Sequence, residues 1–258
     1  AKLGIPIALH EQNSVPGLAN KRTAKSARLI ALGQPAAEGI MCSCAGRSSE
    51  VVFTGNPVRS SVLEGDRSRG RVALGIPQDA TVLLVFGGSL GARHVNERLA
   101  SLKRELLAIE GLYVVHSTGK NGYDETLQAL DLTDAEASRW HVMPYIDDMG
   151  DTLAAADLVV SRAGASSVAE IAALAVPSIL VPYPLATADH QTTNARLLTD
   201  AGAAVKFSDD DIDGDAFRDE LLGLLGDAPC RASMREAARG LAQDKAAAML
   251  ADLLEGIA

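Results

Sequence analysis

The sequence predicts an α/β protein in which a parallel sheet is covered by helices on both faces. Eight short apolar runs alternate with segments of helical pattern, and this alternation is typical of parallel sheets with crossover helices. The composition agrees, because 258 residues with 47% hydrophobic side chains can bury one large core or two smaller ones. The expected strands are residues 5–10, 51–54, 81–86, 113–116, 141–144, 157–161, 178–182 and 203–207.

The clearest expected helix follows the third of these runs, from about residue 90 to residue 110. Its apolar side chains recur at steps of three and four residues, so they share one face of a helix. They are Val95, Leu99, Leu102, Leu106 and Ile109. A second helical pattern begins at Asp215 and continues almost to the end of the chain, with breaks at 226–229 and near Gly240.

Residues 59–70 are the best candidate for a linker, because Ser, Gly and charges of both signs are mixed there. We therefore expect three parts, which are residues 1–60, 61–240 and 241–258. The last part is expected to be a C-terminal helix, and its packing back on the first part is an open alternative.

Charge and cysteine content exclude some classes of protein. The formal net charge of −9 argues against a general nucleic-acid binder, because phosphate backbones are bound by clustered Lys and Arg. Cys42, Cys44 and Cys230 fit neither a zinc spacing nor a disulfide framework, so we expect reduced thiols in a cytosolic protein.

The apolar stretches fall far short of the roughly 20 residues that a membrane-spanning helix needs, and the first ten residues lack the pattern of a signal peptide.

A glycine turn, Gly87-Gly88-Ser89, separates an expected strand from an expected helix within residues 81–99. Glycines let the backbone approach a ligand closely, and free N–H groups at a helix N-terminus attract phosphate. The order GGSLGA, with Gly91 near its end, differs from the Walker A and GxGxxG patterns. A phosphate loop of Gly87, Gly88 and Gly91 and a tight turn capped by Ser89 are both consistent with these residues.

A single carboxylate, Glu170, stands in the otherwise small and apolar stretch SRAGASSVAEIAA at 161–173, where Arg162 is the other charged residue. Ser167 and Glu170 match a capping box, in which the serine caps the helix and the glutamate reaches back to the cap. The stretch also follows an expected strand, and ligands of open α/β sheets lie at the carboxyl ends of strands, where a carboxylate can hold two ribose hydroxyls. Capping and ligand binding therefore remain open for Glu170.

One acidic segment resembles a calcium loop. The pattern D-x-D-x-D-G-x5-E is matched by Asp209, Asp211, Asp213, Gly214 and Glu220. An EF-hand needs a helix before the loop, whereas residues 203–207 are expected to form a strand, and Ala216 lacks the usual branched apolar side chain. We therefore expect an acidic loop and a helix start without bound metal.

Six segments spread over the whole chain form a set that is more specific than any one of them. They are HEQNSVPGLANK at 10–21, GNPVR at 55–59, GGSLGA at 87–92, YIDDM at 145–149, SRAGASSVAEIAA at 161–173 and DHQTTNA at 189–195. In sequence and order they resemble the motifs of the MurG family of bacterial UDP-N-acetylglucosamine transferases. The resemblance implies a two-domain GT-B glycosyltransferase, with a Rossmann-like second domain that binds the sugar-nucleotide donor and with part of the acceptor domain before it.

The resemblance also implies roles for single residues in donor binding. Glu170 would hold the ribose hydroxyls, the backbone around residues 165–167 would face the phosphates, and the backbone of Ile146 would contact the uracil edge. Ser89 and Arg59 would meet the diphosphate, while Gln191 and, from across the cleft, Asn13 would bind the hexosamine. The full implied donor set is Asn13, Arg59, Gly87, Gly88, Ser89, Gly91, Ile146, Ala165, Ser166, Ser167, Val168, Ala169, Glu170 and Gln191.

Three of these residues also have a purely structural interpretation. Asn13 precedes a Val-Pro-Gly turn that it could simply cap, Arg59 is compatible with a linker charge, and Gln191 with a solvated helix residue.

The sequence departs from the family pattern in several respects. Leu90 stands where GGSQGA has a polar residue, and His190 stands where some members have a second glutamine. The family's amino-terminal GGTGGH loop, with its proposed catalytic histidine, is not in this sequence, nor is the second glycine-rich segment that helps to hold the lipid pyrophosphate. His10 is no ready substitute. Since the first residue is Ala1 rather than Met, we expect a fragment that is inactive alone.

The resemblance implies an inverting transferase of peptidoglycan synthesis that converts the lipid I intermediate to lipid II. It would transfer N-acetylglucosamine from UDP-N-acetylglucosamine to a lipid-linked muramyl-pentapeptide, without cofactor or metal, as a peripheral protein on the cytoplasmic face of the bacterial inner membrane. Two alternatives remain open, a non-catalytic nucleotide-sugar-binding module and another GT-B UDP-sugar transferase with a different acceptor.

Overall fold

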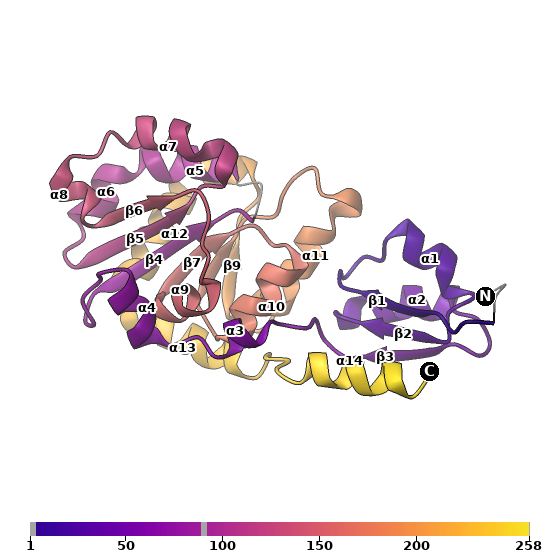
Figure 1. Cartoon of the computed structure of the whole chain (residues 1–258). Helices are drawn as coiled ribbons and strands as arrows, with labels where there is room; N and C mark the ends of the chain where they lie inside the picture. The colour runs from indigo at the N-terminus through magenta and orange to yellow at the C-terminus, as the bar shows by residue number, and fades with distance from the viewer. Residues whose placement is uncertain (1–3, 89–91, 258) are drawn as a thin grey trace.

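Two separate parallel sheets organise the chain in its computed structural model, which describes residues 4–88 and 92–257 (Figure 1). The smaller sheet has three strands in the order β1-β2-β3, and the larger sheet has six in the order β6-β5-β4-β7-β8-β9. Neighbouring strands pair in parallel in both sheets. The predicted α/β class is therefore confirmed.

The smaller sheet contains β1 (Ala8–Glu11), β2 (Leu29–Leu32) and β3 (Glu50–Phe53). Side chains of β2 alternate between its two faces. Ile30 and Leu32 belong to a buried cluster with residues of α1 (Leu18–Ala24) and α2 (Glu38–Cys44). Leu29 on the opposite face is also fully buried, so both faces of this short sheet are covered.

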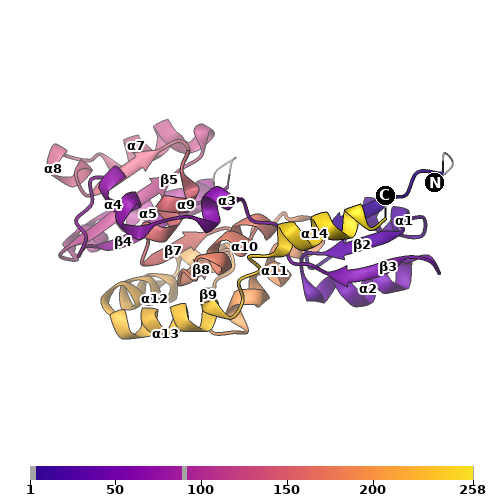
Figure 2. The same cartoon turned by 60° about the horizontal axis from the view of Figure 1, so that its bottom comes forward.

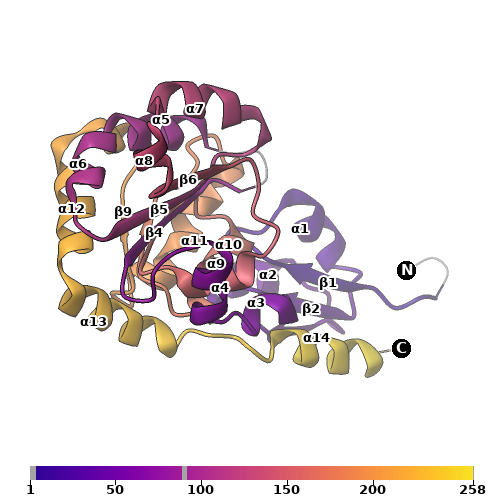
Figure 3. The same ribbon diagram turned by 60° about the vertical axis from the view of Figure 1, so that its left-hand side comes forward.

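The C-terminal helix, α14 (Ala246–Glu255), contacts β2 and lies along the smaller sheet (Figure 2). Gln243 and Ala246 approach Gly55 so closely that a Cβ on this glycine would lie 2.6 Å from Cβ of Gln243. Figure 3 shows α13 (Ala228–Arg239) and α14 following one another from the larger sheet to the smaller one. The end of the chain thus joins the two parts.

The larger sheet has the strand order of a doubly wound nucleotide-binding fold, because β5 and β6 extend from β4 in one direction and β7, β8 and β9 in the other. Its strands are β4 (Thr81–Phe86), β5 (Leu112–Ser117), β6 (Trp140–Met143), β7 (Leu158–Ser161), β8 (Ser178–Leu180) and β9 (Ala204–Lys206). Its helices are α3 (Ser60–Leu63), α4 (Arg67–Ala73), α5 (Arg93–Ser101), α6 (Lys103–Ala108), α7 (Tyr123–Leu130), α8 (Asp134–Ala137), α9 (Met149–Ala155), α10 (Ala165–Ala173), α11 (His190–Thr199), α12 (Asp215–Gly226) and α13. Single 3-10 turns lie at Pro35–Ala37, Lys120–Gly122, Thr187–Asp189 and Asp210–Asp213.

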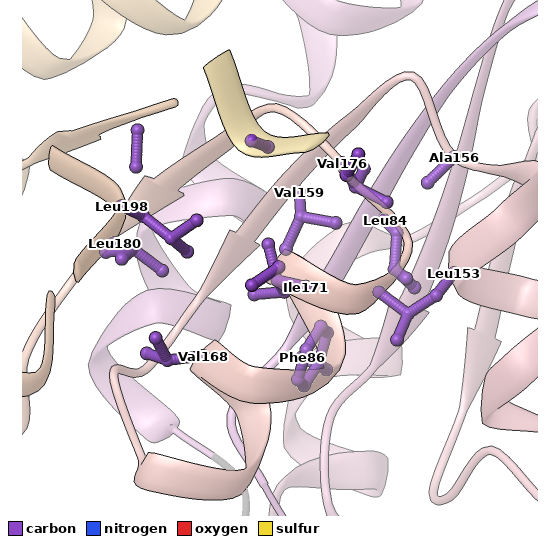
Figure 4. Packing of buried hydrophobic residues seen from close by; sticks show 14 of the residues in the cluster. Leu84, Phe86, Leu153, Ala156, Val159, Val168, Ile171, Val176, Leu180 and Leu198 are labelled. Atoms are coloured by element: carbon purple, nitrogen blue, oxygen red, sulfur yellow. The ribbon is translucent and has the colours of Figure 1, made fainter. Parts of the chain in front are cut away.

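Apolar clusters cover both faces of the larger sheet. Leu84 of β4 belongs to a buried cluster with Val168 of α10 (Figure 4). Val85, the next residue of β4, belongs to another cluster with Leu99 of α5. Because successive side chains of a strand point to opposite faces, α5 and α10 lie on opposite faces of the sheet.

All eight expected strands overlap observed strands, but the sequence analysis missed β2. The expected helix from about 90 to 110 is interrupted, since Leu102 (φ −91°, ψ 9°) separates α5 from α6. The expected linker at 59–70 carries α3 and the start of α4, and both helices contact α9. Within residues 4–88 and 92–257, no helix is both long and apolar enough to cross a membrane.

Helices α4 and α9 pack closely because Gly70 faces α9. A Cβ on Gly70 would lie 2.1 Å from the backbone oxygen of Asp151, so we expect Gly70→Ala to lower the free energy of unfolding by about 1 to 3 kcal/mol through overpacking. Gly223→Ala in α12 is the control, because its added Cβ meets no described atom within 4 Å. It should raise stability by up to about 1 kcal/mol. Urea unfolding measures both changes, and equal effects would contradict the packing argument.

Candidate functional site

A cavity of about 710 Å³ opens at the carboxyl ends of β4 and β7, the adjacent strands at which the sheet reverses its winding. Gly87 and Gly88 of its lining follow β4, and Arg162 and Gly164 follow β7. Because α5 and α10 leave these strands on opposite faces, the connections diverge and leave a crevice between them. Ligands of open α/β sheets bind at this position.

Two helix N-termini border the cavity. α5 begins at Arg93 and α10 at Ala165, and residues next to both starts line the cavity. The first N–H groups of a helix have no partner within the helix and carry partial positive charge, which favours phosphate. Gly88 has a φ of +81°, a conformation that favours glycine. Ser89 and Gly91 of the predicted phosphate loop lie outside the described residues.

The capping box that the sequence left open for Ser167 and Glu170 does not form. Gly164 is the N-cap of α10, with extended backbone (φ −63°, ψ 147°), so Ser167 lies inside the first turn and does not cap the helix. Ser167 lines the cavity, and Glu170 follows three residues later on the same side of the helix. Glu170 is therefore not the glutamate of a capping box.

Glu170 instead forms an ion pair with Arg59. Nη2 of Arg59 donates a hydrogen bond of 3.3 Å to Oε1 of Glu170, which joins two residues 111 positions apart. The side chain of Glu170 is 15% exposed and that of Arg59 is 61% exposed. Burial raises the pKa of Glu170, and the positive charge of Arg59 opposes this rise. Two residues of the predicted donor set thus meet at the edge of α10, one turn beyond the cavity lining.

Gln191 of α11 lies in the cavity wall. Its Oε1 accepts hydrogen bonds from the backbone N–H groups of Ala163 (3.1 Å) and Tyr183 (2.9 Å). These bonds fix the position of the side chain against the β7 and β8 connections. Its NH2 group takes no part in either bond, so it is the part of the side chain that can meet a ligand.

Asn13 does not line the cavity but belongs to a contact between the two parts of the chain. Nδ2 of Asn194 donates to Oδ1 of Asn13 (3.3 Å) and to the backbone oxygen of Ala163 (3.2 Å). Oδ1 of Asn194 accepts from both the backbone N–H and the hydroxyl of Ser14, each at 2.9 Å. The fully buried Asn194 side chain therefore ties the loop after β1 to the turn after β7.

Buried Glu11 organises the loop that carries Asn13. Its carboxylate accepts hydrogen bonds from the backbone N–H groups of Asn13 (3.0 Å) and Gly17 (2.9 Å) and from the amide of Asn20 (2.9 Å). Glu11, rather than Asn13, therefore accepts the backbone N–H of Gly17 in the turn before α1.

The other predicted donor residues do not line the cavity. Ile146 is 4% exposed in the loop between β6 and α9 and belongs to the core cluster that includes Val168. The side chains of Ala165 and Val168 are buried, Ser166 is exposed, and Ala169 is half-buried. The first turn of α10 can therefore offer its backbone, rather than most of its side chains, to a ligand.

The sequence analysis did not predict that Arg162, Asp209 and His94 meet in the cavity wall. Arg162, directly after β7, donates from Nη1 to Oδ1 of Asp209 and to the backbone oxygen of Pro182 (3.2 Å), and its guanidinium carbon lies 5.6 Å from the Tyr183 ring centroid. Oδ2 of Asp209 lies 2.9 Å from Nδ1 of His94. The position of Arg162 directly after a buried strand is a sequence signal for a site residue. The contact between His94 and Asp209 spans 115 positions, so no local sequence pattern predicts it.

The acidic segment at 209–220 holds His94 in this structure. Its entering element is the strand β9, as predicted, and a 3-10 turn at Asp210–Asp213 follows. Nε2 of His94 lies 3.2 Å from Oδ2 of Asp213, so both ring nitrogens face carboxylates. Among the described residues, no group of three or more His, Cys, Asp or Glu side chains has the arrangement of a metal site.

The chain is similar to proteins of one family over its whole length. Residues 82–253 match the glycosyltransferase family 28 C-terminal domain. The UDP-N-acetylglucosamine–N-acetylmuramyl-(pentapeptide) pyrophosphoryl-undecaprenol N-acetylglucosamine transferase of Acetivibrio thermocellus is 37% identical over 257 residues, covering 100% of this chain and 68% of that protein. The transferase of the same name from Desulforudis audaxviator is 39% identical and is covered to the same 68%, with 99% of this chain matched.

The fold is similar to that of a solved member of this family. The crystal structure of MurG from Acinetobacter baumannii has a TM-score of 0.74 and 31% sequence identity, covering 99% of this chain and 68% of that one. The GT-B architecture that the sequence implied is thereby confirmed.

His94 provides a pH-dependent prediction. Carboxylates only accept hydrogen bonds, so both contacts of the ring require its doubly protonated form, and the hydrogen bond to Asp209 raises the pKa of His94 above 6.5. The contribution of His94 to stability is therefore complete below about pH 6.5 and is lost as pH rises through its folded-state pKa. We expect His94→Gln to lower the free energy of unfolding by up to about 1 kcal/mol at about pH 6, and by less at about pH 9.

Urea unfolding across this pH range measures the trend. His141→Gln is the control, because its Nε2 contacts the backbone oxygen of Ser138 (3.2 Å) rather than a carboxylate. A difference between wild type and His94→Gln that stays constant with pH would contradict the charged-histidine assignment.

Proposed function

Because the chain belongs to the MurG family of glycosyltransferases, we propose that it acts in the transfer of N-acetylglucosamine from UDP-N-acetylglucosamine to a lipid-linked muramyl-pentapeptide. The reaction forms a β-1,4 bond with inversion at C1, and UDP leaves. The observation that carries this proposal is the cavity between β4 and β7, which two helix N-termini border. Its place and its polarity suit a nucleoside diphosphate.

In this proposal the diphosphate lies between the starts of α5 and α10. The N–H groups of the glycine turn and of residues 165–167 would donate to its oxygens, with Ser89 and Gly91 of the turn included from the sequence resemblance alone. Arg162 lies in the cavity wall, and its ion pair with Asp209 holds its guanidinium group in place. Positive charge and oriented N–H groups stabilise the diphosphate as it departs, which lowers the barrier to transfer.

The nucleoside and sugar would extend from the diphosphate in opposite directions. We assign the ribose hydroxyls to Glu170, the uracil edge to the backbone of Ile146, and the hexosamine hydroxyls to the NH2 group of Gln191. The ion pair of Glu170 with Arg59 supports the first assignment, because it holds the carboxylate at the edge of α10 with a cation beside it. Asn13 would approach the sugar from the other part of the chain through its link to Asn194.

We propose that residues 1–60 belong to the acceptor-binding part, that residues 61–240 bind the donor, and that residues 241–258 join the two. The separate sheets and the contact of α14 with β2 support this division. Since the acceptor is lipid-linked, we further propose that the protein works at the cytoplasmic face of the bacterial inner membrane as a peripheral protein.

Titration calorimetry tests the donor site directly. The chain should bind UDP and UDP-N-acetylglucosamine, and it should bind UDP-glucose more weakly, because a site with polar groups for the acetamido substituent leaves them unpaired with glucose. Folded protein that gives no heat with UDP or either sugar nucleotide would defeat the proposal.

Glu170→Gln separates ligand binding from stability. We expect UDP affinity to fall by about 5- to 150-fold, because about 1 to 3 kcal/mol is lost when a carboxylate no longer accepts two hydroxyl hydrogen bonds. The free energy of unfolding should change by less than about 1 kcal/mol, because Arg59 is largely exposed. Asp219→Asn, which breaks an exposed ion pair with Arg218 in α12, is the matched control and should leave UDP affinity unchanged. Unchanged UDP affinity in Glu170→Gln, together with a clear loss of stability, would assign the residue to structure alone.

A further inference from the structure

A second cluster of charged side chains lies at the opposite edge of the larger sheet, around Asp157. This residue directly precedes β7, so it stands at the amino ends of the strands, away from the donor cavity. Helices α4 and α13 flank this edge (Figure 1). A cavity of about 340 Å³ lies beside α13, with Asp157, Arg231, Arg235 and Arg239 in its lining.

Asp157 already accepts three hydrogen bonds. Its Oδ1 accepts from Arg67 (2.6 Å), and its Oδ2 accepts from Arg71 (2.9 Å) and from the backbone N–H of Val82 (2.8 Å). One carboxylate thus accepts hydrogen bonds from two guanidinium groups and from a backbone N–H group near the start of β4. It cannot also neutralise the arginines that α13 brings to the same place.

The arginines of α13 recur every four residues, at 231, 235 and 239, so they form a stripe on one side of the helix. Arg231 donates to the backbone oxygens of Leu224 and Leu225, and Arg235 donates from Nη2 to the backbone oxygen of Ala156 (3.2 Å). These carbonyls are neutral and leave the positive charges uncancelled. Within the described structure, only Arg239 of the stripe has a carboxylate partner, Glu236.

Positive charge is therefore in excess around this cavity. The cavity lining holds three guanidinium groups, those of Arg231, Arg235 and Arg239, and two carboxylates, those of Asp157 and Glu236, and Asp157 is already paired with Arg67 and Arg71. Burial lowers the pKa of Arg235, and the charges of Arg67, Arg239 and Arg231 lower it further, against the opposing effect of Asp157. The excess is notable in a chain whose formal net charge is −9, and a bound anion would relieve the repulsion among these arginines.

We propose that this cavity binds a phosphate group, either as free phosphate or as part of a lipid headgroup. Planar guanidinium groups match the oxygens of phosphate in pairs, and such charge-assisted bonds are among the strongest that side chains make. Arg235 stands at the centre of the stripe with one turn of helix to each of its arginine neighbours, so its remaining N–H groups can converge with theirs on one ligand. A volume of about 340 Å³ is large enough to hold a phosphate group.

The first test uses inorganic phosphate on the whole chain, with saturating UDP present so that the donor cavity is occupied. Phosphate should raise the melting temperature relative to chloride at equal ionic strength, because a ligand that binds only the folded state stabilises it. In Arg235→Gln the phosphate affinity should be about tenfold lower, since one charge-assisted contact is lost.

A second variant of the stripe and a control variant complete the test. Arg239→Gln changes a more exposed member of the stripe and should also weaken phosphate binding if Arg235→Gln is too unstable to measure. Arg218→Gln is the matched control, because it removes the same charge from α12, where Arg218 pairs with Asp215 and Asp219. Equal phosphate affinity in the wild type and both stripe variants, or no phosphate effect in the wild type, would overturn the proposal.

Cosedimentation with vesicles identifies the source of the phosphate group. Binding to vesicles of phosphatidylglycerol and phosphatidylcholine that falls at least severalfold in Arg235→Gln and Arg239→Gln, but not in Arg218→Gln, would support a headgroup. Vesicle binding that is equal in all four proteins, together with the expected difference in binding of inorganic phosphate, would support a free phosphate. The two proposals can fail separately. If phosphate does not bind to this cavity, the proposed binding of UDP at the donor cavity is not affected. If UDP does not bind, phosphate binding to this cavity can still be measured.

Discussion

The divergence of the chain after β4 and β7 is the constraint on which the rest of the site depends. Both strands end at the same edge of a parallel sheet, but α5 packs on one face and α10 on the other. Two helix N-termini consequently point into one crevice that no side chain of the sheet fills. The apolar alternation along β4 produces this arrangement, because it anchors one helix to each face. A site for a phosphate-bearing ligand is therefore a consequence of how the core is packed.

Hydrogen bonds from two side chains of α11 hold one wall of that crevice in position. Ala163, in the turn after β7, is contacted through its N–H by Gln191 and through its oxygen by Asn194. Asn194 also holds Ser14 of the first part of the chain. The turn that begins α10 is thus connected to both α11 and the loop after β1. A movement between the two parts would therefore shift this turn at the wall of the cavity.

Much of this could be predicted from the sequence, and what could not has physical reasons. Strands such as β4 and β5 are short, mainly apolar runs between polar segments, so their location is evident. β2 was missed because Ala24, Ala27 and Ile30 step by three and continue the helical pattern of α1. The capping box at Ser167 failed because Gly164 ends the extended backbone earlier, so the helix starts at Ala165. The contacts of His94 with Asp209 and of Arg59 with Glu170 join residues more than a hundred positions apart, which no local pattern reveals.

The most direct test of the donor-site assignment is a crystal structure of the chain with UDP bound. The account predicts the diphosphate between the N-termini of α5 and α10, near Arg162, with the ribose hydroxyls within hydrogen-bond distance of the Glu170 carboxylate. A diphosphate bound away from these two helix starts, or a ribose that leaves Glu170 without contact, would contradict it.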